Sequence, residues 1–275
     1  MGELIAQVEG IGVLGPGLPD WPATAALLQG GSPDISQPTV VPVPDGLPPA
    51  ERRRLGRVVK LALAVGLEAT SRARVNPAVL PAVFASSGGD GHNCHEICEA
   101  LSHEERLISP TRFHNSVHNA AAGYWSIATG AQVASNALCA FDASFAAGLL
   151  EAVVQVVVEG TRVLLVAYDA QYPVPLFAKR PIPEAFGVAL VLGPAAGTGS
   201  PDRAPEPASI GRISVALSES PADRMKDPSF ESLRASIPAA RSLPLLLHLA
   251  RRQAVVVHID YLDGRSIAVE IESCT

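Results

Sequence analysis

The sequence predicts an α/β fold in which helices and strands alternate along the chain and pack in layers. Apolar runs of strand length alternate with segments whose apolar residues recur at helical spacing, and glycine, proline and aspartate mark the joints between them. The 275 residues are 48% hydrophobic and 17% charged, whereas soluble domains carry about 25% charged residues. This composition predicts a large core and excludes a disordered chain and a small disulfide-stapled scaffold.

The first part of the chain alternates short apolar runs with helical patterns. Residues 30–50 are rich in proline, glycine and aspartate, which predicts a loop. Pro48 and Glu51 then place a proline and an acid where helix starts prefer them. In chain order, we expect a strand at 5–13, a helix at 21–28, a helix from 48 to 69, a strand at 79–86 and a helix at 93–101.

The second part continues the alternation. The segment 139–158 is apolar on nearly all sides, with Asp142 and Glu151 its only charges, which predicts a buried helix. Residues 193–208 form a linker rich in proline and glycine. The remaining elements expected are a helix at 119–129 that Gly130 ends, strands at 133–138, 162–168, 187–192 and 212–217, a helix at 238–252 and a hairpin of strands 254–260 and 266–271 around Asp263–Gly264.

Low charge content has two explanations: the core is unusually large, or a partner covers part of the apolar surface. The net charge of −6 argues against a nucleic-acid-binding protein. The segment 1–5 lacks the basic and apolar regions of a signal peptide, and apolar runs are interrupted before the ~18–20 residues that span a bilayer. Four cysteines, Cys94, Cys98, Cys139 and Cys274, are too scattered for a disulfide framework, so we expect a cytoplasmic protein.

Two motifs match cofactor or metal patterns only superficially. Gly10, Gly12 and Gly15 have the spacing of a dinucleotide-binding fingerprint, but a Pro-Gly-Leu-Pro segment replaces the helix that would meet the pyrophosphate. We therefore expect a structural glycine turn and no cofactor. Zinc-binding residue types also gather in one segment, but no second ligand pair follows, so we expect a polar helix start with buried cysteines and no metal. These residues are His92, Cys94, His95, Cys98 and His103.

Cys139 is the candidate nucleophile. It lies where a strand is expected to turn into the buried helix, and the positive end of a helix lowers the pKa of a thiol. Asp142 in the first helical turn would oppose that effect. Covalent catalysis also needs a base and an oxyanion partner, which no histidine motif supplies. The alternative is a buried structural cysteine.

The segment before Cys139 resembles the β-ketoacyl synthase family. Asn119, Ala122, Gly123, Ser126, Ile127 and Gly130, followed by nine residues to Cys139, are similar to the stretch that leads to the family's nucleophilic cysteine. Other segments are similar to the family's opening strand and short helix (9–30), first long helix (52–73), glycine-rich strand end (85–89) and the strand that ends its N-terminal half (185–192). The resemblance covers about residues 1–220.

The resemblance implies a thiolase-like layered α-β-α fold with a mixed sheet, limited to one N-terminal half of a synthase. Residues 1–220 would be the ketosynthase N-terminal-like domain, and residues 221–275 a C-terminal helix and hairpin packed on the same domain. A complete synthase has a second half that carries the catalytic histidines. Residues 140–144, Ala-Phe-Asp-Ala-Ser, also replace the family's small turn after the cysteine. Cys139 would then be a vestigial nucleophile.

This pattern resembles the chain-length-factor-like subunits of aryl polyene and related pigment biosynthesis, which pair with a full ketosynthase. It implies a non-catalytic partner in polyene or fatty-acid-type biosynthesis, with strand 133–138 pairing across the two-fold axis. Because the net charge is negative, we expect the ketosynthase to receive the acyl carrier protein. The residues expected at the interface and acyl tunnel are Phe113, Asn115, Asn119, Val133, Ala134, Ser135, Asn136, Ala137, Leu138, Phe141 and Asp142.

Two other functions remain open. The chain could be a compact acyltransferase or condensing enzyme that uses Cys139, with His114, His118 or His258 as an improvised base. It could also be a homodimer with a structural or regulatory role.

Overall fold

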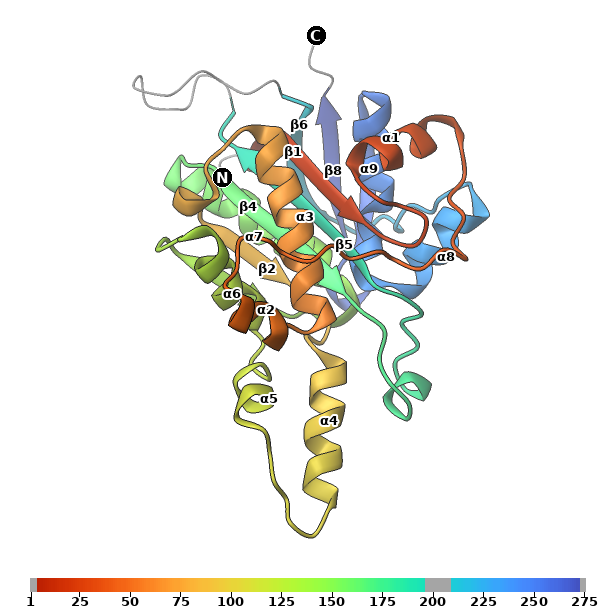
Figure 1. Cartoon of the computed structure of the whole chain (residues 1–275). Helices are drawn as coiled ribbons and strands as arrows, with labels where there is room; N and C mark the ends of the chain where they lie inside the picture. The colour runs from red at the N-terminus through yellow and green to blue at the C-terminus, as the bar shows by residue number, and fades with distance from the viewer. Residues whose placement is uncertain (1–3, 196–208, 273–275) are drawn as a thin grey trace.

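One mixed sheet runs through the molecule, as the computed structural model of residues 4–195 and 209–272 shows (Figure 1). In these ranges it holds eight strands in the order β3-β2-β4-β5-β1-β6-β8-β7. Neighbours from β3 to β4 are parallel and all later neighbours are antiparallel. The strands are β1 (Leu4–Leu14), β2 (Ala82–Ala85), β3 (Ser135–Leu138), β4 (Val163–Asp169), β5 (Phe186–Gly193), β6 (Gly211–Ser218), β7 (Val255–Asp260) and β8 (Ser266–Glu272).

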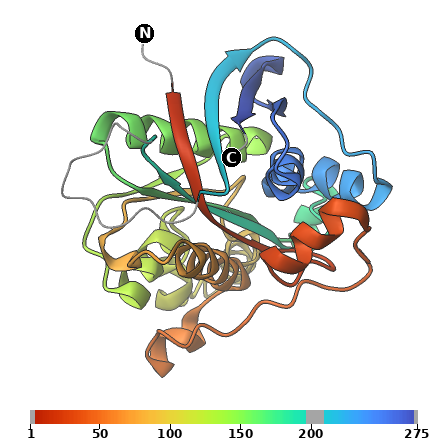
Figure 2. The same ribbon diagram turned by 90° about the horizontal axis from the view of Figure 1, so that it is seen from above.

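Helices cover both faces of the sheet and give the layered α-β-α architecture that the sequence predicts. Figure 2 shows α3 (Arg57–Ala73) and α7 (Ser144–Glu159) on opposite sides of the strands. With α3 packs α6 (Ala120–Thr129), and with α7 pack α1 (Trp21–Gly30), α8 (Pro228–Ser236) and α9 (Leu243–Arg251). Strand β4 serves both cores, because Leu165 faces the α7 side and Leu164 the α3 side, as alternation along a strand requires.

Two glycines of the fingerprint-like motif, Gly10 and Gly12, lie inside β1, whereas Gly15 begins the predicted turn, in which it exchanges backbone hydrogen bonds with Leu18 at 2.9 and 3.0 Å. An added Cβ at Gly10 would lie 2.3 Å from the Ala69 carbonyl oxygen, and one at Gly12 would lie 2.1 Å from the Val65 carbonyl oxygen. Both glycines therefore let α3 approach the strand closely. The expected glycine turn is therefore confirmed at Gly15, while Gly10 and Gly12 serve a helix–strand contact instead.

The structure corrects the boundaries around Cys139. Strand β3 begins at Ser135 instead of Val133, and a 3-10 turn (Phe141–Ala143) precedes α7. Helix α7 is buried on one face only, since Val158 at its end is 71% exposed. One helix among the described residues, Phe141–Glu159, is apolar and long enough to cross a bilayer on those grounds alone, contrary to the expectation from interrupted apolar runs. Half of that stretch is buried, as in a core helix.

Other boundaries differ where local chemistry interrupts a pattern. The long helix expected from residue 48 is two helices, α2 (Pro49–Arg54) and α3, because Leu55 turns the backbone to an extended conformation. Residues 77–79 form a 3-10 turn instead of the start of β2. Helix α4 (Gly91–Ser102) and the unpredicted α5 (Pro110–His114) form an arm that projects from the body (Figure 1). The terminal hairpin of β7 and β8 is confirmed, whereas most of the expected linker lies outside the described residues.

Gly130 ends α6 in the left-handed conformation, with φ of +72°, and open space surrounds its Cα. We expect Gly130→Val to lower the free energy of unfolding by roughly 1–2 kcal/mol, because a β-branched residue is strained there. Gly123→Ala is the matched control, because an added Cβ there also meets nothing within 4 Å. Gly123 lies inside the helix, so the alanine should raise the free energy of unfolding by roughly 0.5–1 kcal/mol. Urea unfolding of both variants measures the difference. Equal stabilities would contradict the assigned helix end.

Candidate functional site

Strand β3 presents an open backbone edge. It lies at one end of the sheet and pairs with β2. Ala134 and Leu138 turn their carbonyl oxygens toward β2, where they accept from Ala82 and Ser86 at 3.2 Å. By the alternation of a parallel strand, Ser135 and Ala137 direct their N–H and C=O groups outward. In the described part of the chain no hydrogen bond reaches those outward groups.

At the opposite edge of the sheet, the chain itself binds the outward backbone groups of His258 on β7. His258 of β7 donates its backbone N–H to the Asp223 carboxylate at 2.8 Å and accepts from the Asp223 N–H at 2.8 Å. The two edges therefore differ at these residues: His258 on β7 is bound by Asp223, whereas no hydrogen bond in the described part of the chain reaches the outward groups of Ser135 and Ala137 on β3. An open edge is a template for pairing with another strand.

Exposed apolar side chains flank the open edge. On β3 and just before it, most exposed side chains are small or apolar and none is charged, the polar exceptions being Gln132 and Asn136; α6 packs beside the strand. Phe113 on α5 is 67% exposed and Phe141 after β3 is 62% exposed. Of the residues expected at an interface, Val133, Ala134 and Asn119 are also exposed, whereas Asn115 is buried. The Asn115 amide donates to the Arg54 carbonyl and its oxygen accepts from the Tyr124 hydroxyl, so it stabilises the arm.

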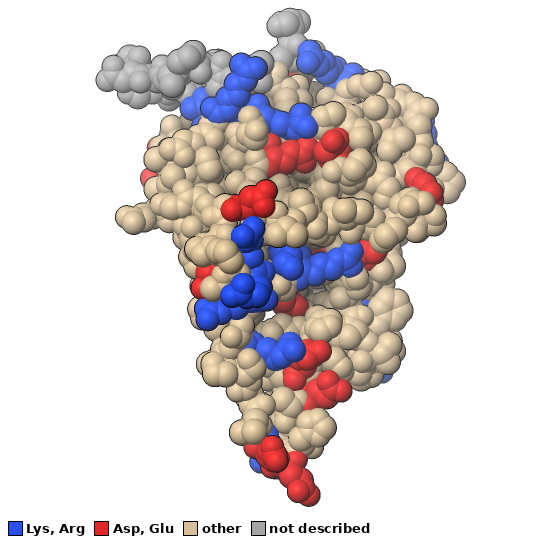
Figure 3. Space-filling view, in the orientation of Figure 1, with Lys and Arg blue, Asp and Glu red and all other residues tan. Residues whose placement is uncertain are grey.

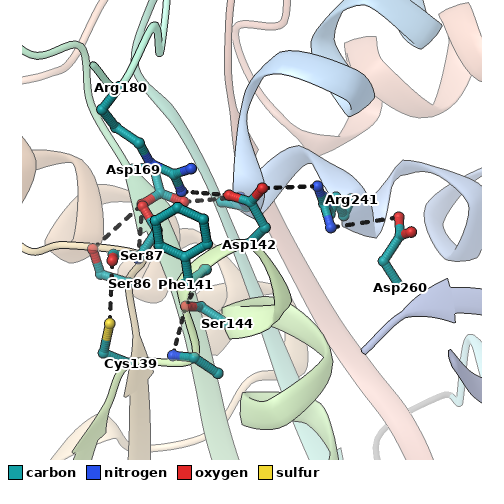
Figure 4. Close-up of polar contacts among 12 residues, drawn as sticks. Ser86, Ser87, Cys139, Phe141, Asp142, Ser144, Asp169, Arg180, Arg241 and Asp260 are labelled. Carbon is teal, nitrogen blue, oxygen red and sulfur yellow. Dashed lines mark hydrogen bonds and ion pairs between the residues drawn. The ribbon is translucent and has the colours of Figure 1, made fainter. Parts of the chain in front are cut away.

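Cys139 is an exposed thiol that lies before the elbow between β3 and α7 rather than at the start of the helix (Figure 4). Its S–H donates to the Ser87 carbonyl oxygen at 3.1 Å. The expected alternative of a buried structural cysteine is wrong, and so is the placement at a helix N-terminus. Among the described residues no histidine is hydrogen-bonded to this thiol. His258 lies on β7 at the far edge of the sheet, so it cannot act as its base.

Asp169 is a buried carboxylate at the centre of the polar network (Figure 4). It accepts from the Ser87 N–H at 2.9 Å, the Ser87 hydroxyl at 2.6 Å and the Ala239 N–H at 2.9 Å. Burial raises the pKa of Asp169 to about 6, although these hydrogen bonds favour the charged form. The network fixes the Ser87 segment, and through it the partner of the Cys139 thiol.

The elbow between β3 and α7 is the 3-10 turn Phe141–Ala143, which ion pairs, a cation–π contact and the Ser144 hydroxyl hold in place. Phe141 has a φ of +52°, which non-glycine residues rarely adopt. The guanidinium of Arg180 lies over its ring, 3.9 Å from the centroid. Asp142 pairs with Arg180 and, at 3.1 Å, with Arg241, and Arg241 continues to Asp260 at 3.7 Å (Figure 4). The interaction chain thus links the elbow to the C-terminal part of the protein.

A cavity of about 660 Å³ lies between α2, the base of the arm and the loop after β4. Figure 3 shows Lys and Arg side chains gathered over α2 and the start of α3. Three of these arginines face carboxylates: Arg52 pairs with Asp45, Arg54 with Glu51 and Arg57 with Glu184. These arginines are therefore clustered over α2 and the start of α3, but much of their charge is paired.

The zinc-like segment forms α4, as predicted, but its cysteines are not buried. Cys94 and Cys98 are both exposed on the arm. Partial burial and the neighbouring Cys98 raise the pKa of the Cys94 thiol, which disfavours the thiolate that binds metal. Within the described ranges no group of three His, Cys, Asp or Glu side chains could hold a metal ion.

Asp169 makes the stability of the fold pH-dependent. Its pKa of about 6 in the folded chain exceeds the ordinary value of 3.8, so folding binds a proton between those values. We expect the stability of the wild type relative to Asp169→Asn to be greatest below pH 4 and to fall, by up to roughly 3 kcal/mol, as pH rises through 6. Chemical unfolding of both proteins at pH 4 and pH 7.5 measures this difference. A pH-independent difference would contradict it.

Comparisons with known proteins agree with this architecture. The family described as "Beta-ketoacyl synthase, N-terminal domain" matches residues 23–227, more than half of the chain. No curated protein sequence matches the chain.

Solved structures share the fold. A chain of a ketosynthase (ApeO) in complex with its chain length factor (ApeC) from Xenorhabdus doucetiae aligns with a TM-score of 0.71 and 24% identity, covering 96% of this chain and 98% of that one. The ishigamide ketosynthase/chain length factor aligns with a TM-score of 0.70 and 13% identity, covering 98% and 99%. The thiolase-like ketosynthase fold expected from the sequence is confirmed. On the family match, the chain belongs to the β-ketoacyl synthase family, of which it carries the N-terminal domain.

Proposed function

We propose that this chain is a non-catalytic, chain-length-factor-like subunit that pairs with a full β-ketoacyl-acyl-carrier-protein synthase in the cytoplasm. The observation that supports this most directly is the open edge of β3, with apolar side chains beside it and an exposed thiol to which no histidine of the described residues is hydrogen-bonded. The product class is polyene or fatty-acid-type chains, by analogy with the ketosynthase and chain length factor complexes that share the fold.

The open edge favours an obligatory partner. Long-lived exposed edges are usually blunted by charge, proline, a bulge or a covering segment. Strand β3 contains no charged residue and no proline. No segment of the described chain hydrogen-bonds to its outward groups as Asp223 does to His258 on β7. A strand of the partner can therefore add its backbone hydrogen bonds here. The interface residues that we assign on this basis are the half-buried Leu138 and Asp142 and the exposed residues Phe113, Asn119, Val133, Ala134, Ser135, Asn136, Ala137 and Phe141.

The assignment as non-catalytic rests on Cys139. The thiol aligns with the family nucleophile, but its hydrogen-bond partner is a carbonyl oxygen, which accepts and does not remove a proton. Condensation would require the catalytic histidines of the partner ketosynthase. That partner would also receive the acyl carrier protein, so the carrier would contact this chain only indirectly.

The strand pairing can be tested with two substitutions at one position. Ala137→Pro removes an outward N–H while leaving the bonds to β2 intact, and it should abolish the complex with a co-expressed partner ketosynthase. Ala137→Ser keeps the N–H and the small side chain, and it should preserve the complex. Light scattering after size-exclusion chromatography of the co-expressed pairs measures the outcome. A complex that survives Ala137→Pro would contradict the strand placement.

The proposal also predicts that Cys139 is dispensable. The Cys139→Ala complex should elongate chains at the wild-type rate, because the partner supplies the nucleophile. Intact-mass analysis of the wild-type chain after incubation with acyl-carrier-protein thioesters should show no acyl adduct. If Cys139→Ala abolished elongation while the complex still formed, or if an adduct appeared on Cys139, the acyltransferase or condensing-enzyme alternative would be favoured.

The open edge also fits a second copy of this chain. Sedimentation of the chain alone and with the ketosynthase separates the two assemblies. A stable homodimer that does not exchange with the ketosynthase would support the structural or regulatory role instead.

A further inference from the structure

We propose that Cys94 and Cys98 on the projecting arm form a two-coordinate binding site for a soft monovalent cation, Cu(I). The site does not involve strand β3, so it stands or falls independently of the proposed function. It gives a role to the cysteine pair of α4, which pairing with a ketosynthase leaves unexplained.

The two thiols lie on one face of a helix. Residues four apart in an α-helix are neighbours, with their Cβ atoms about 5–6 Å apart. Helix α4 runs without interruption from Gly91 to Ser102, and both cysteines on it are exposed. A hydrogen bond between the two side chains is one of the causes that raise the pKa of the Cys94 thiol, so the two sulfur atoms interact. An ion that arrives from solvent therefore meets both thiols together.

The spacing of the pair fits a bridging ion better than a disulfide. A disulfide needs Cβ atoms about 3.5–4.5 Å apart and sulfur atoms about 2.05 Å apart, which is closer than the helical spacing allows. Two metal–thiolate bonds of about 2.3 Å, placed end to end, separate the sulfur atoms by about 4.6 Å. Side chains four residues apart reach this separation, so an ion can join them without distorting α4.

The ligand set selects the ion. Within the described ranges no group of three His, Cys, Asp or Glu side chains could hold a metal ion, so the four-ligand coordination of structural zinc is not available. Soft thiolate ligands select Cu(I), which accepts linear coordination by two sulfur atoms. Glu96, on the same helix, is already paired with Arg112 at 2.8 Å and with His92 at 3.8 Å. The cysteine pair therefore supplies the complete set of ligands.

The charges near the pair also favour a cation. The charge of Cys98 and the carboxylate of Asp90, the N-cap residue of α4, both raise the pKa of the Cys94 thiol, because they oppose a further negative charge. A cation between the sulfur atoms removes that repulsion. Two thiols and one Cu(I) give one bis-thiolate complex and two protons, so the step needs no oxidant or reductant. The complex carries one negative charge, whereas two free thiolates would carry two.

A bridge across one turn of α4 would stiffen the arm. The Asn93 amide donates to the Arg112 carbonyl at 2.8 Å, and the Arg112 guanidinium pairs with Glu96, so α4 holds α5 in place. Because the ion would tie the two ends of that turn together, we expect amide hydrogen exchange in residues 91–102 to slow when Cu(I) binds.

The test is an anaerobic titration of the full chain with Cu(I), in competition with a chromophoric Cu(I) chelator. A chain with Cys139→Ser and Cys274→Ser keeps only the pair and should still bind one Cu(I). Adding Cys98→Ser should lower the affinity roughly 100-fold or more, because loss of one ligand gives up the chelate. Cys98 is exposed, so this serine should leave the far-UV circular dichroism spectrum unchanged.

A register variant is the matched control. In the same background, Cys98→Ser with Glu99→Cys keeps two thiols on α4 but moves one of them about 100° around the helix. It should bind Cu(I) as weakly as Cys98→Ser, and its hydrogen exchange should not respond to Cu(I). Tight binding by either variant would show that any exposed thiol suffices and would overturn the proposal.

Intact-mass analysis of the metal-free chain tests the argument from spacing. The pair should remain as two thiols in air over the time of the titration. A loss of two hydrogens within one chain that Cys98→Ser prevents would show an intramolecular disulfide and would also overturn the proposal. All of these measurements use this chain alone, so a failure to pair with a ketosynthase would leave them unaffected.

Discussion

The buried carboxylate of Asp169 organises the functional end of this fold. A carboxylate without solvent must be hydrogen-bonded, and its partners come from two distant segments, Ser87 after β2 and Ala239 in the C-terminal part. One side chain thereby fixes where β2 ends and where the C-terminal segment crosses the sheet. The same hydrogen bonds from Ser87 to Asp169 also fix the Ser87 carbonyl oxygen that accepts from the Cys139 thiol.

The C-terminal part acts on the elbow by a second route. Arg241, two residues after Ala239, pairs with Asp142, so the Asp169 network and the elbow share one anchor. This arrangement explains how a non-glycine residue stays in the left-handed conformation at Phe141. The conformational cost is met by contacts spread over several elements, which is the usual condition for local strain at a functional position.

The alternation of helices and strands is readable from the sequence because apolar periodicity determines it, as α3, α6 and the β7–β8 hairpin show. The sequence also indicates the region around Cys139, through its family resemblance. The details that matter at the site depend on distant contacts. The 3-10 turn at Phe141–Ala143 and the late start of α7 follow from Ser144 and from Arg180 and Arg241, far along the chain. No local pattern encodes those pairings.

The low charge of the chain now has two separate causes. The two cores on either face of the sheet account for the many fully buried aliphatic residues, and one face of α7 belongs to them. The remaining uncharged residues lie on the surface, as an uncharged edge strand and exposed aromatic rings. Monomeric proteins usually carry charged residues at such an edge or cover it, as Asp223 covers His258 on β7. Under the proposed function, a strand of the partner would pair with the open edge of β3, whereas on β7 the chain itself binds the outward groups of His258.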